Sequence, residues 1–113
     1  MEIEKLMEWS YRISREKGFW DKERNKAEMI ALMHSELSEA LEELRKPASK
    51  FDKLYHTIDK EGEYKPEGLV VELADTMIRI ADFCRGFDLP LETALVAKLR
   101  YNECREPMHG KLF

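Results

Sequence analysis

The sequence predicts an all-α fold, a single domain over residues 1–113 built as a bundle of about four to five helices. The chain of 113 residues is 43% hydrophobic and 37% charged, a balance that suits a helix-rich domain with one core. Only five glycines and four prolines are present, mostly near the expected ends of elements. This scarcity favours long helices over many short strands.

The first helix is expected over residues 2–17. Its apolar side chains recur in a mostly helical rhythm at Ile3, Leu6, Met7, Trp9 and Ile13. Gly18 ends the helix, and Phe19 and Trp20 follow at a turn. These two aromatic rings either cap the core or line a pocket for a nucleobase, on which an aromatic face can stack.

The second helix is expected over residues 26–45, after a short polar connection, and Pro47 closes it. Its expected core face consists of Ile30, Met33, Leu37, Ala40, Leu41 and Leu44. Glu36 and Glu39 lie beside this face, on a side that they share with apolar residues, so this edge is not simply a wet surface. His34 is expected to face solvent.

Residues 47–67 form the least regular segment. We expect one short amphipathic helix at Phe51, Leu54, Tyr55 and Ile58. Residues 59–68 are charged and interrupted by glycine and proline, so we expect a loop, either a mobile lid or a plain connection. Pro66 is expected to introduce the next helix.

The third helix, expected over residues 68–85, is apolar on almost all sides and is therefore expected to be buried. Its main polar line is Glu72, Asp75, Arg79 and Asp82, at spacings of three and four. Carboxylates on a buried helix are poorly solvated, so a cation should face them. The single positive charge of Arg79 cannot offset the negative charges of three acids.

Two expected helices thus carry an acid pair at a spacing of three residues. The pairs are Glu36 with Glu39 and Glu72 with Asp75. If the two helices pack together, four carboxylates converge. Oxygen ligands of this kind suit a hard cation such as Mg²⁺ or Mn²⁺.

The last helix is expected over residues 90–105. Lys98, Asn102 and Arg105 lie at positions i, i+4 and i+7, on one face. This face is either an ordinary exposed basic edge or a set of two cations and an amide directed at anionic oxygens. In the tail, Lys111 either belongs to a flexible end or reaches a phosphate.

The net charge and the two cysteines argue against several functional classes of protein. The net charge of −4 argues against binding to nucleic acid or a membrane surface, because such proteins present a basic face. A nucleotide ligand stays open, since a metal ion can supply positive charge. Cys84 and Cys104 form no CxxC pair, so neither a disulfide framework nor a zinc site is indicated. No segment reaches transmembrane length, and a cytoplasmic protein is expected.

The acid pairs and the basic face occur in an order that resembles a known family. Glu36-x-x-Glu39, then Glu72-x-x-Asp75, then Lys98-x-x-x-Asn102-x-x-Arg105 is similar to the motif order of the MazG-like all-α nucleoside triphosphate pyrophosphohydrolases. The resemblance covers roughly residues 24–111, and the run from Glu72 to Arg79 is especially similar.

The resemblance implies a fold and a reaction. The fold would be a MazG-like helical bundle completed by homo-oligomerisation, as a dimer or a tetramer. The reaction would be the cleavage of a (d)NTP between its α and β phosphates, giving a (d)NMP and pyrophosphate, with nucleotide-pool house-cleaning as one possible role. A helix that is apolar on nearly all sides argues independently for an oligomer, because about four helices in one chain supply too few neighbours.

The resemblance also implies roles for individual residues. The ligands of Mg²⁺, or of Mn²⁺, would be Glu36, Glu39, Glu72 and Asp75. Glu36 or Glu39 would take the proton of the attacking water. Lys98 and Arg105 would contact phosphate oxygens, and Asn102 a phosphate or sugar oxygen. The family pattern begins with two adjacent acids, and Ser35 stands at the first of those positions here.

Several questions stay open at this point. Candidates for the base pocket are Trp20, Asn25, Phe19 and Trp9, and the base and sugar preference is not indicated. One alternative is a non-catalytic helical oligomer whose acids pair with Arg79 and Lys98, and another is a nucleotide-binding or regulatory protein with a degenerate site. A di-iron carboxylate bundle would need Glu-x-x-His pairs, which His34 and His56 do not provide.

Overall fold

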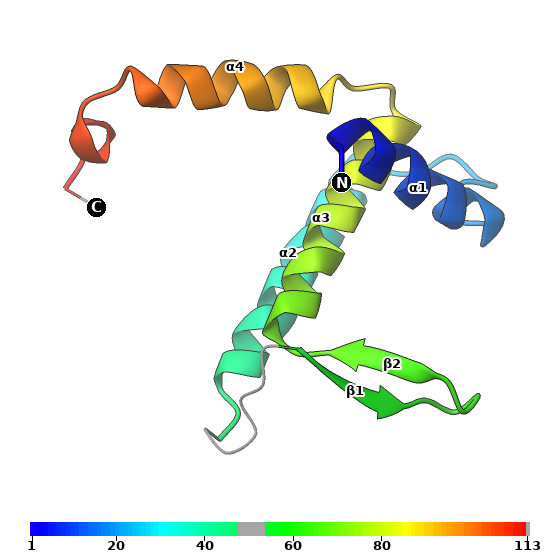
Figure 1. Ribbon diagram of the computed structural model, residues 1–113. Helices are drawn as coiled ribbons and strands as arrows, with labels where there is room; N and C mark the ends of the chain where they lie inside the picture. Colours follow the sequence, from blue (N-terminus) through cyan, green and yellow to red (C-terminus); the bar gives the residue numbers. More distant parts are fainter. Residues whose placement is uncertain (48–53, 113) are drawn as a thin grey trace.

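The computed structural model describes residues 1–47 and 54–112. Within these ranges the chain forms four α-helices, one two-stranded sheet and a short 3₁₀ turn (Figure 1). The elements are α1 (Ile3–Glu16), α2 (Lys26–Leu44), β1 (Tyr55–Ile58), β2 (Tyr64–Glu67), α3 (Leu69–Gly86), α4 (Leu91–Glu103) and η2 (Pro107–Gly110). The four helices predicted from apolar spacing are confirmed, with ends within two residues of those expected. None of the described helices combines the length and the apolar character needed to cross a bilayer.

α2 and α3 run antiparallel and lie side by side (Figure 1). α2 begins where the Asn25 side chain accepts a hydrogen bond of 3.0 Å from the backbone N–H of Glu28. α1 packs across the C-terminal part of α3, and this crossing holds the buried core. That core consists of Met7, Ala81 and Cys84, surrounded by Ile3, Leu6, Ile80, Phe83 and Leu91.

A β-hairpin stands where the sequence predicted a short helix and a loop. β1 and β2 pair antiparallel, with Tyr55 opposite Glu67 and Ile58 opposite Tyr64. The predicted helix is therefore wrong over residues 55–58, and its Phe51 lies outside the described residues. Aromatic and β-branched side chains in this segment favour a strand once a partner strand is present. The fold is mostly helical, and the all-α prediction is wrong in this segment.

The turn of the hairpin is stabilised by one side chain. The Asp59 carboxylate accepts hydrogen bonds of 2.9 Å from the backbone N–H groups of Glu61 and Glu63. Pro66 lies within β2 rather than at the start of a helix, so that prediction is wrong as well. α3 begins after Gly68, whose φ of 114° is a conformation that favours glycine.

The apolar face predicted to be the core of α2 is largely exposed in the single chain. Ile30, Leu37, Leu41 and Leu44 are between 43% and 56% exposed. Of the predicted face, Ala40 is buried as expected, and the other buried residues of α2 are Met29 and Glu36, which lie beside that face. The prediction that α3 is buried on all sides also fails for one chain, since Val70, Leu73, Met77 and Ile78 are between 42% and 54% exposed.

The surface area measures how incomplete this burial is. The chain of 13.4 kDa exposes 9197 Å², whereas a compact monomer of that mass exposes about 6,500 Å². Its radius of gyration is 16.9 Å, against about 13 Å for a compact domain of this length. One reason is α4, which has no buried residue and extends away from α2 and α3 (Figure 1).

Trp20 fastens the connection between α1 and α2 to the end of α3. Its indole Nε1 donates a hydrogen bond of 2.9 Å to Oδ1 of Asp82. Its ring stands edge-on to Tyr11 and Phe87, with centroids 5.6 and 5.3 Å away. The ring fits against α3 because residue 86 is a glycine, and a Cβ atom at Gly86 would overlap the ring.

Gly86→Ala is expected to destabilise the fold by about 1–3 kcal/mol, because the new methyl group overlaps the indole ring of Trp20. Helix propensity alone predicts the opposite sign, a gain of up to about 1 kcal/mol. Urea unfolding measures the difference. In a Trp20→Leu background the loss should disappear, and an equal loss in both backgrounds would contradict this explanation.

Candidate metal centre

Three carboxylates meet at the seam between α2 and α3. One oxygen from each of Glu36, Glu39 and Glu72 lies within 4.8 Å of the others. Glu36 and Glu39 share one side of α2 because they are three residues apart, and Glu72 lies in the first turn of α3. Antiparallel packing of the two helices brings the pairs face to face. Three of the four acids singled out in the sequence are thus brought together.

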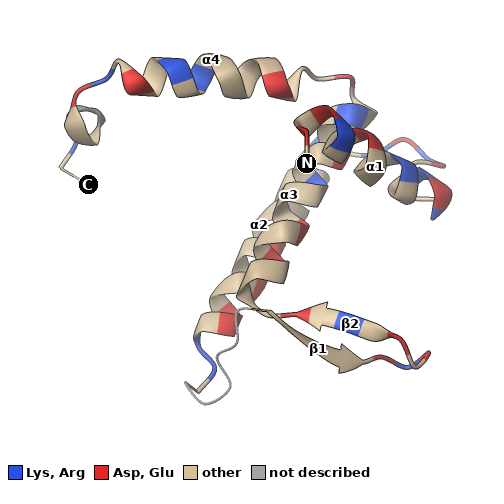
Figure 2. Cartoon of the chain, viewed as in Figure 1, with Lys and Arg blue, Asp and Glu red and all other residues tan. Residues whose placement is uncertain are grey.

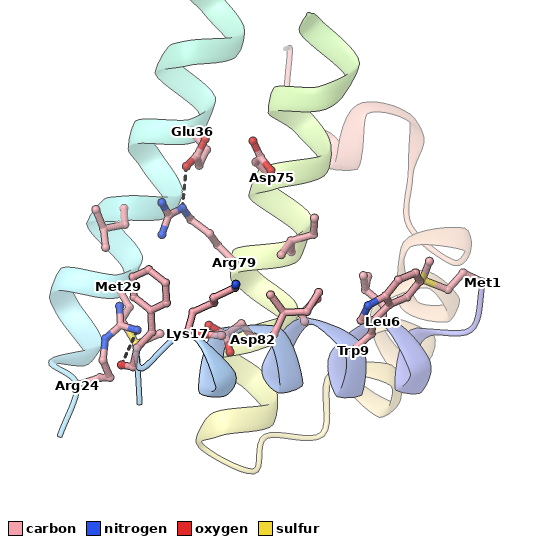
Figure 3. Close-up of a pocket in the computed structure, with 16 residues that line it drawn as sticks. Met1, Leu6, Trp9, Lys17, Arg24, Met29, Glu36, Asp75, Arg79 and Asp82 are labelled. Carbon is pink, nitrogen blue, oxygen red and sulfur yellow. Dashed lines mark hydrogen bonds and ion pairs between the residues drawn. The ribbon is translucent and has the colours of Figure 1, made fainter. Parts of the chain in front are cut away.

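Asp75, the fourth acid, lies one turn further along α3, outside this group of three. Burial raises the pKa of the Asp75 carboxyl, and the negative charge of Glu36 raises it further. The positive charge of Arg79 offsets part of that rise, and Lys65 on β2 acts in the same direction as Arg79. Asp75 and Glu36 line the same cavity (Figure 3).

Arg79 neutralises one of the acids. Its Nε donates to Oε1 of Glu36 at 2.8 Å (Figure 3). The Glu36 side chain is only 10% exposed, so removing Arg79 would leave a nearly buried charge without a partner. Within residues 1–47 and 54–112, no ion pair joins a cation to Glu39, Glu72 or Asp75.

Glu72 is the least satisfied acid of the group. Its Oε2 is buried and has no hydrogen-bond partner among the described residues. Burial, then a hydrogen bond with Glu39, raises the pKa of Glu72 to about 7, and the charges of Glu39, Asp75 and Glu36 add to the rise. Near neutral pH the carboxyl therefore holds a proton part of the time. A divalent cation would compete for that same position.

The donor set suits a hard divalent cation. Glu36, Glu39 and Glu72 offer carboxylate oxygens alone, which Mg²⁺ and Mn²⁺ prefer, and neither His nor Cys belongs to the group. The buried Glu72 Oε2 has no protein donor, which is the state expected of an oxygen that a cation completes. These three residues could hold the ion, with Asp75 one turn away.

A cavity of about 620 Å³ opens beside the acids, between α1, α2 and α3 (Figure 3). Its volume lies within the range usual for small-molecule pockets. Glu36, Asp75 and Arg79 form one end. The rest of the wall is mainly apolar and includes Leu6, Trp9, Ile13, Phe19, Met29, Leu32 and Ile78. Charged side chains also line the cavity away from this end, at Lys17, Arg24 and Asp82 (Figure 3). A cavity with mainly apolar walls and charged groups at its edges suits a ligand that has a flat apolar part and a charged part.

The predicted phosphate-contacting residues lie together, away from the acids. Lys98 and Arg105 flank the ring of Tyr101, at 4.8 and 5.4 Å from its centroid. Oδ1 of Asn102 is buried without a hydrogen-bond partner among the described residues. Figure 2 shows the blue basic stretch of α4 well apart from the red acids of α2 and α3. Within one chain the acids and this basic face do not meet.

The predicted base-pocket residues divide into two groups. Trp9 and Phe19 line the cavity. Trp20 does not line it, since its indole is engaged with Asp82 and packs at Gly86. Asn25 caps α2 through its side chain. Trp20 and Asn25 thus have structural partners, and their predicted roles in substrate binding stay predictions.

Sequence reasoning missed several cavity residues, notably Lys17, Arg24 and Ile78. For Lys17 a signal existed, because Trp9, Ile13 and Lys17 follow one another at a spacing of four along α1. Arg24 and Ile78 depend on how α1 crosses α3, which no local pattern encodes. Ser35, at the position of the family's first acid, is exposed and donates to the backbone oxygen of Leu32 at 2.7 Å.

Comparison with protein-family models, with curated proteins and with solved structures gave no match for this chain. The likeness to the MazG-like family therefore rests on the motifs in the sequence.

Glu72→Gln is expected to stabilise the metal-free protein at pH 8 by about 1–2 kcal/mol and to change little at pH 5. The folded-state pKa of Glu72, about 7, lies above its ordinary value of 4.5. The folded wild type therefore binds the proton more tightly than the unfolded chain and loses stability as pH rises between these values. Glutamine removes that loss.

Urea unfolding in EDTA across this pH range measures the effect. Glu42→Gln is the control, because Glu42 is an exposed acid on α2 that lies outside the acid cluster and pairs with Arg45. A pH-independent difference for Glu72→Gln would show that its carboxyl is not perturbed.

Proposed function

We propose that this protein is a Mg²⁺-dependent nucleotide pyrophosphohydrolase that converts a (d)NTP into a (d)NMP and pyrophosphate, acting on the cytoplasmic nucleotide pool. The observation that carries the proposal is the meeting of Glu36, Glu39 and Glu72, with Glu72 Oε2 buried and unpartnered. A cavity with mainly apolar walls lies beside them. This combination suits a metal-bridged polyphosphate with a base attached.

In the proposed reaction, Glu36, Glu39, Glu72 and Asp75 hold the metal. Once bound, Mg²⁺ or Mn²⁺ supplies positive charge that offsets the triphosphate and the charge developing in the transition state. Glu36 is oriented by its 2.8 Å bond from Arg79. Glu39 is the exposed member of the group, so it is the better placed of the two to accept the proton of an attacking water.

In this proposal the cavity would bind the nucleoside part of the substrate. Trp9 and Phe19 are half-exposed aromatic residues on its wall, 46% and 60% exposed, and each offers surface on which a base can stack. Arg24 lies near the Phe19 ring, with its guanidinium carbon 5.9 Å from the ring centroid, and its Nη1 donates to the Phe19 carbonyl oxygen. Arg24 thereby holds this aromatic residue in position at the cavity wall.

The proposal includes a homo-oligomer. The single chain exposes about 2,700 Å² more than a compact monomer of its mass, while a standard interface buries about 800 Å² per partner. Exposed apolar stripes run along three helices, at Leu37 and Leu41 on α2, Leu73 and Met77 on α3, and Leu95 and Leu99 on α4. A second copy has the matching surface, and a two-fold interface would cover these stripes in pairs.

In such an oligomer, a partner's α4 would supply the basic face that the acids lack. Within one chain α4 packs only lightly, against α1. Lys98 and Asn102 are therefore available to a neighbouring subunit. Lys98 and Arg105 would then neutralise phosphate oxygens, and Asn102, with its unpartnered Oδ1, would bind a donor from the sugar or from the partner.

A second candidate function is favoured by one observation. The 2.8 Å bond between Arg79 and Glu36 is also what a structural ion pair at a helix seam would look like. In that case the chain is a non-catalytic helical oligomer, or a nucleotide-binding protein whose site is degenerate at Ser35. The two candidates differ in turnover, which the following experiment measures.

The chain is expected to release pyrophosphate from at least one member of a panel of canonical and modified NTPs and dNTPs, with Mg²⁺ or Mn²⁺ and not with EDTA. Glu39→Gln should lower the rate by at least about a hundredfold, because it removes charge and a proton acceptor from the site. Glu42→Gln, an exposed acid on the same helix, should keep wild-type activity. A well-folded oligomer with no turnover on any substrate would favour the second candidate.

A subunit-mixing experiment tests whether α4 acts on a partner's acids. Glu72→Gln and Lys98→Ala are each expected to be inactive alone, and their equimolar mixture should recover roughly a quarter of wild-type activity. Half of randomly assorted dimers are then mixed, and one of their two sites has both residues intact. No recovery after verified exchange of subunits would contradict the shared site.

A further inference from the structure

A second hollow, of about 330 Å³, lies outside the acid site, between α1 and the C-terminal end of α3. Its lining residues are Glu8, Tyr11, Arg12, Arg15 and Arg85. Three arginines thus line one hollow, and the only acid among the described lining residues is Glu8, in a chain whose net charge is −4. Like charges that line one hollow repel one another, and an anion bound in the hollow would reduce that repulsion.

α1 places two of these arginines. Arg12 and Arg15 follow Glu8 at spacings of four and seven, so all three lie on one helix face. The nearest carboxylate to Arg12 is that of Glu16, at 4.0 Å, and both side chains are more than half exposed, so this pair is weak. Arg15 lies over the Tyr11 ring, 5.3 Å from its centroid, which orients its guanidinium without neutralising it.

α3 contributes the third arginine, Arg85, which has a buried N–H group without an acceptor among the described residues. Nη2 of Arg85 donates to Oε2 of Glu4 at 3.1 Å and to the Glu4 backbone oxygen at 3.5 Å. Nε of the same guanidinium is buried and has no acceptor among the described residues. A buried charged donor without an acceptor is unfavourable, so one N–H group of an arginine that lines the hollow lacks a hydrogen-bond partner among the described residues.

We propose that this hollow is a binding site for a phosphate-type oxyanion: inorganic phosphate, pyrophosphate or the phosphorylated end of a nucleotide. The planar guanidinium group of arginine can donate two parallel hydrogen bonds to the oxygens of a phosphate. Three arginines at one hollow therefore suit an anion with more than one negative charge. The site uses none of the acids at the seam of α2 and α3. The proposal of this anion site therefore does not depend on the hydrolase proposal.

The test is a titration of the full chain in EDTA, followed through the arginine Nε–Hε signals in ¹H–¹⁵N spectra. The probes are inorganic phosphate, pyrophosphate and a nucleoside monophosphate, each compared with chloride at equal ionic strength. We expect saturable shifts of the Arg85 Nε–Hε signal, and the tightest of the three probes identifies the source of the oxyanion. EDTA prevents anions from being held through a metal at the acid site.

The matched variants remove two charges each. Arg12→Gln with Arg15→Gln should weaken phosphate binding by at least about tenfold, since two charge-assisted contacts are lost. Arg45→Gln with Arg100→Gln removes the same charge from two exposed positions, one directly after α2 and one on α4, and should leave the affinity within about twofold. An Arg85 signal that does not move, that moves equally with chloride, or that saturates equally in both double variants would overturn the proposal.

Discussion

The packing of α2 against α3 is the constraint on which the candidate site depends. The seam buries Glu36 and partly buries Glu72, although carboxylates are costly to remove from water. Arg79 forms its ion pair with Glu36, and burial together with Glu39 and the neighbouring charges raises the pKa of Glu72 to about 7. A seam built only for stability would be better filled by apolar side chains. The buried acids are therefore the basis of the cation proposal, under which the adjoining cavity would hold the ligand of that cation.

Local patterns in the sequence were sufficient for the helices and for three of the acids. Apolar spacing located α1 to α4, and a spacing of three residues placed Glu36 beside Glu39 on the side of α2 that meets α3. The hairpin was missed because Tyr55 and Ile58, three residues apart, fit a helix face as well as a strand, and pairing with β2 decides between them. The course of α4 was also beyond local patterns, since few intrachain contacts hold it.

The unburied surface of the single chain connects fold and function. α2 packs against α3 with Met29, Glu36 and Ala40 buried, which leaves Leu37 and Leu41 of its apolar face exposed. The helical period identifies the apolar face but cannot say which part of it a neighbour in the same chain covers. The same surface explains why the acids and the face at Lys98 lie apart in one chain. An assembly that buries the exposed part of this face would bring further helices to the seam, so the oligomer and the site are parts of one hypothesis.

The most direct test of the cation hypothesis is the free energy of unfolding as a function of Mg²⁺ concentration, at constant ionic strength and constant protein concentration. A cation that binds the seam of the folded state should add about 1.4 kcal/mol at tenfold excess over its Kd, and more at higher excess. If stability instead follows the curve measured with a monovalent salt, the acids form no metal site. The ion pair of Glu36 with Arg79 would then be a structural feature.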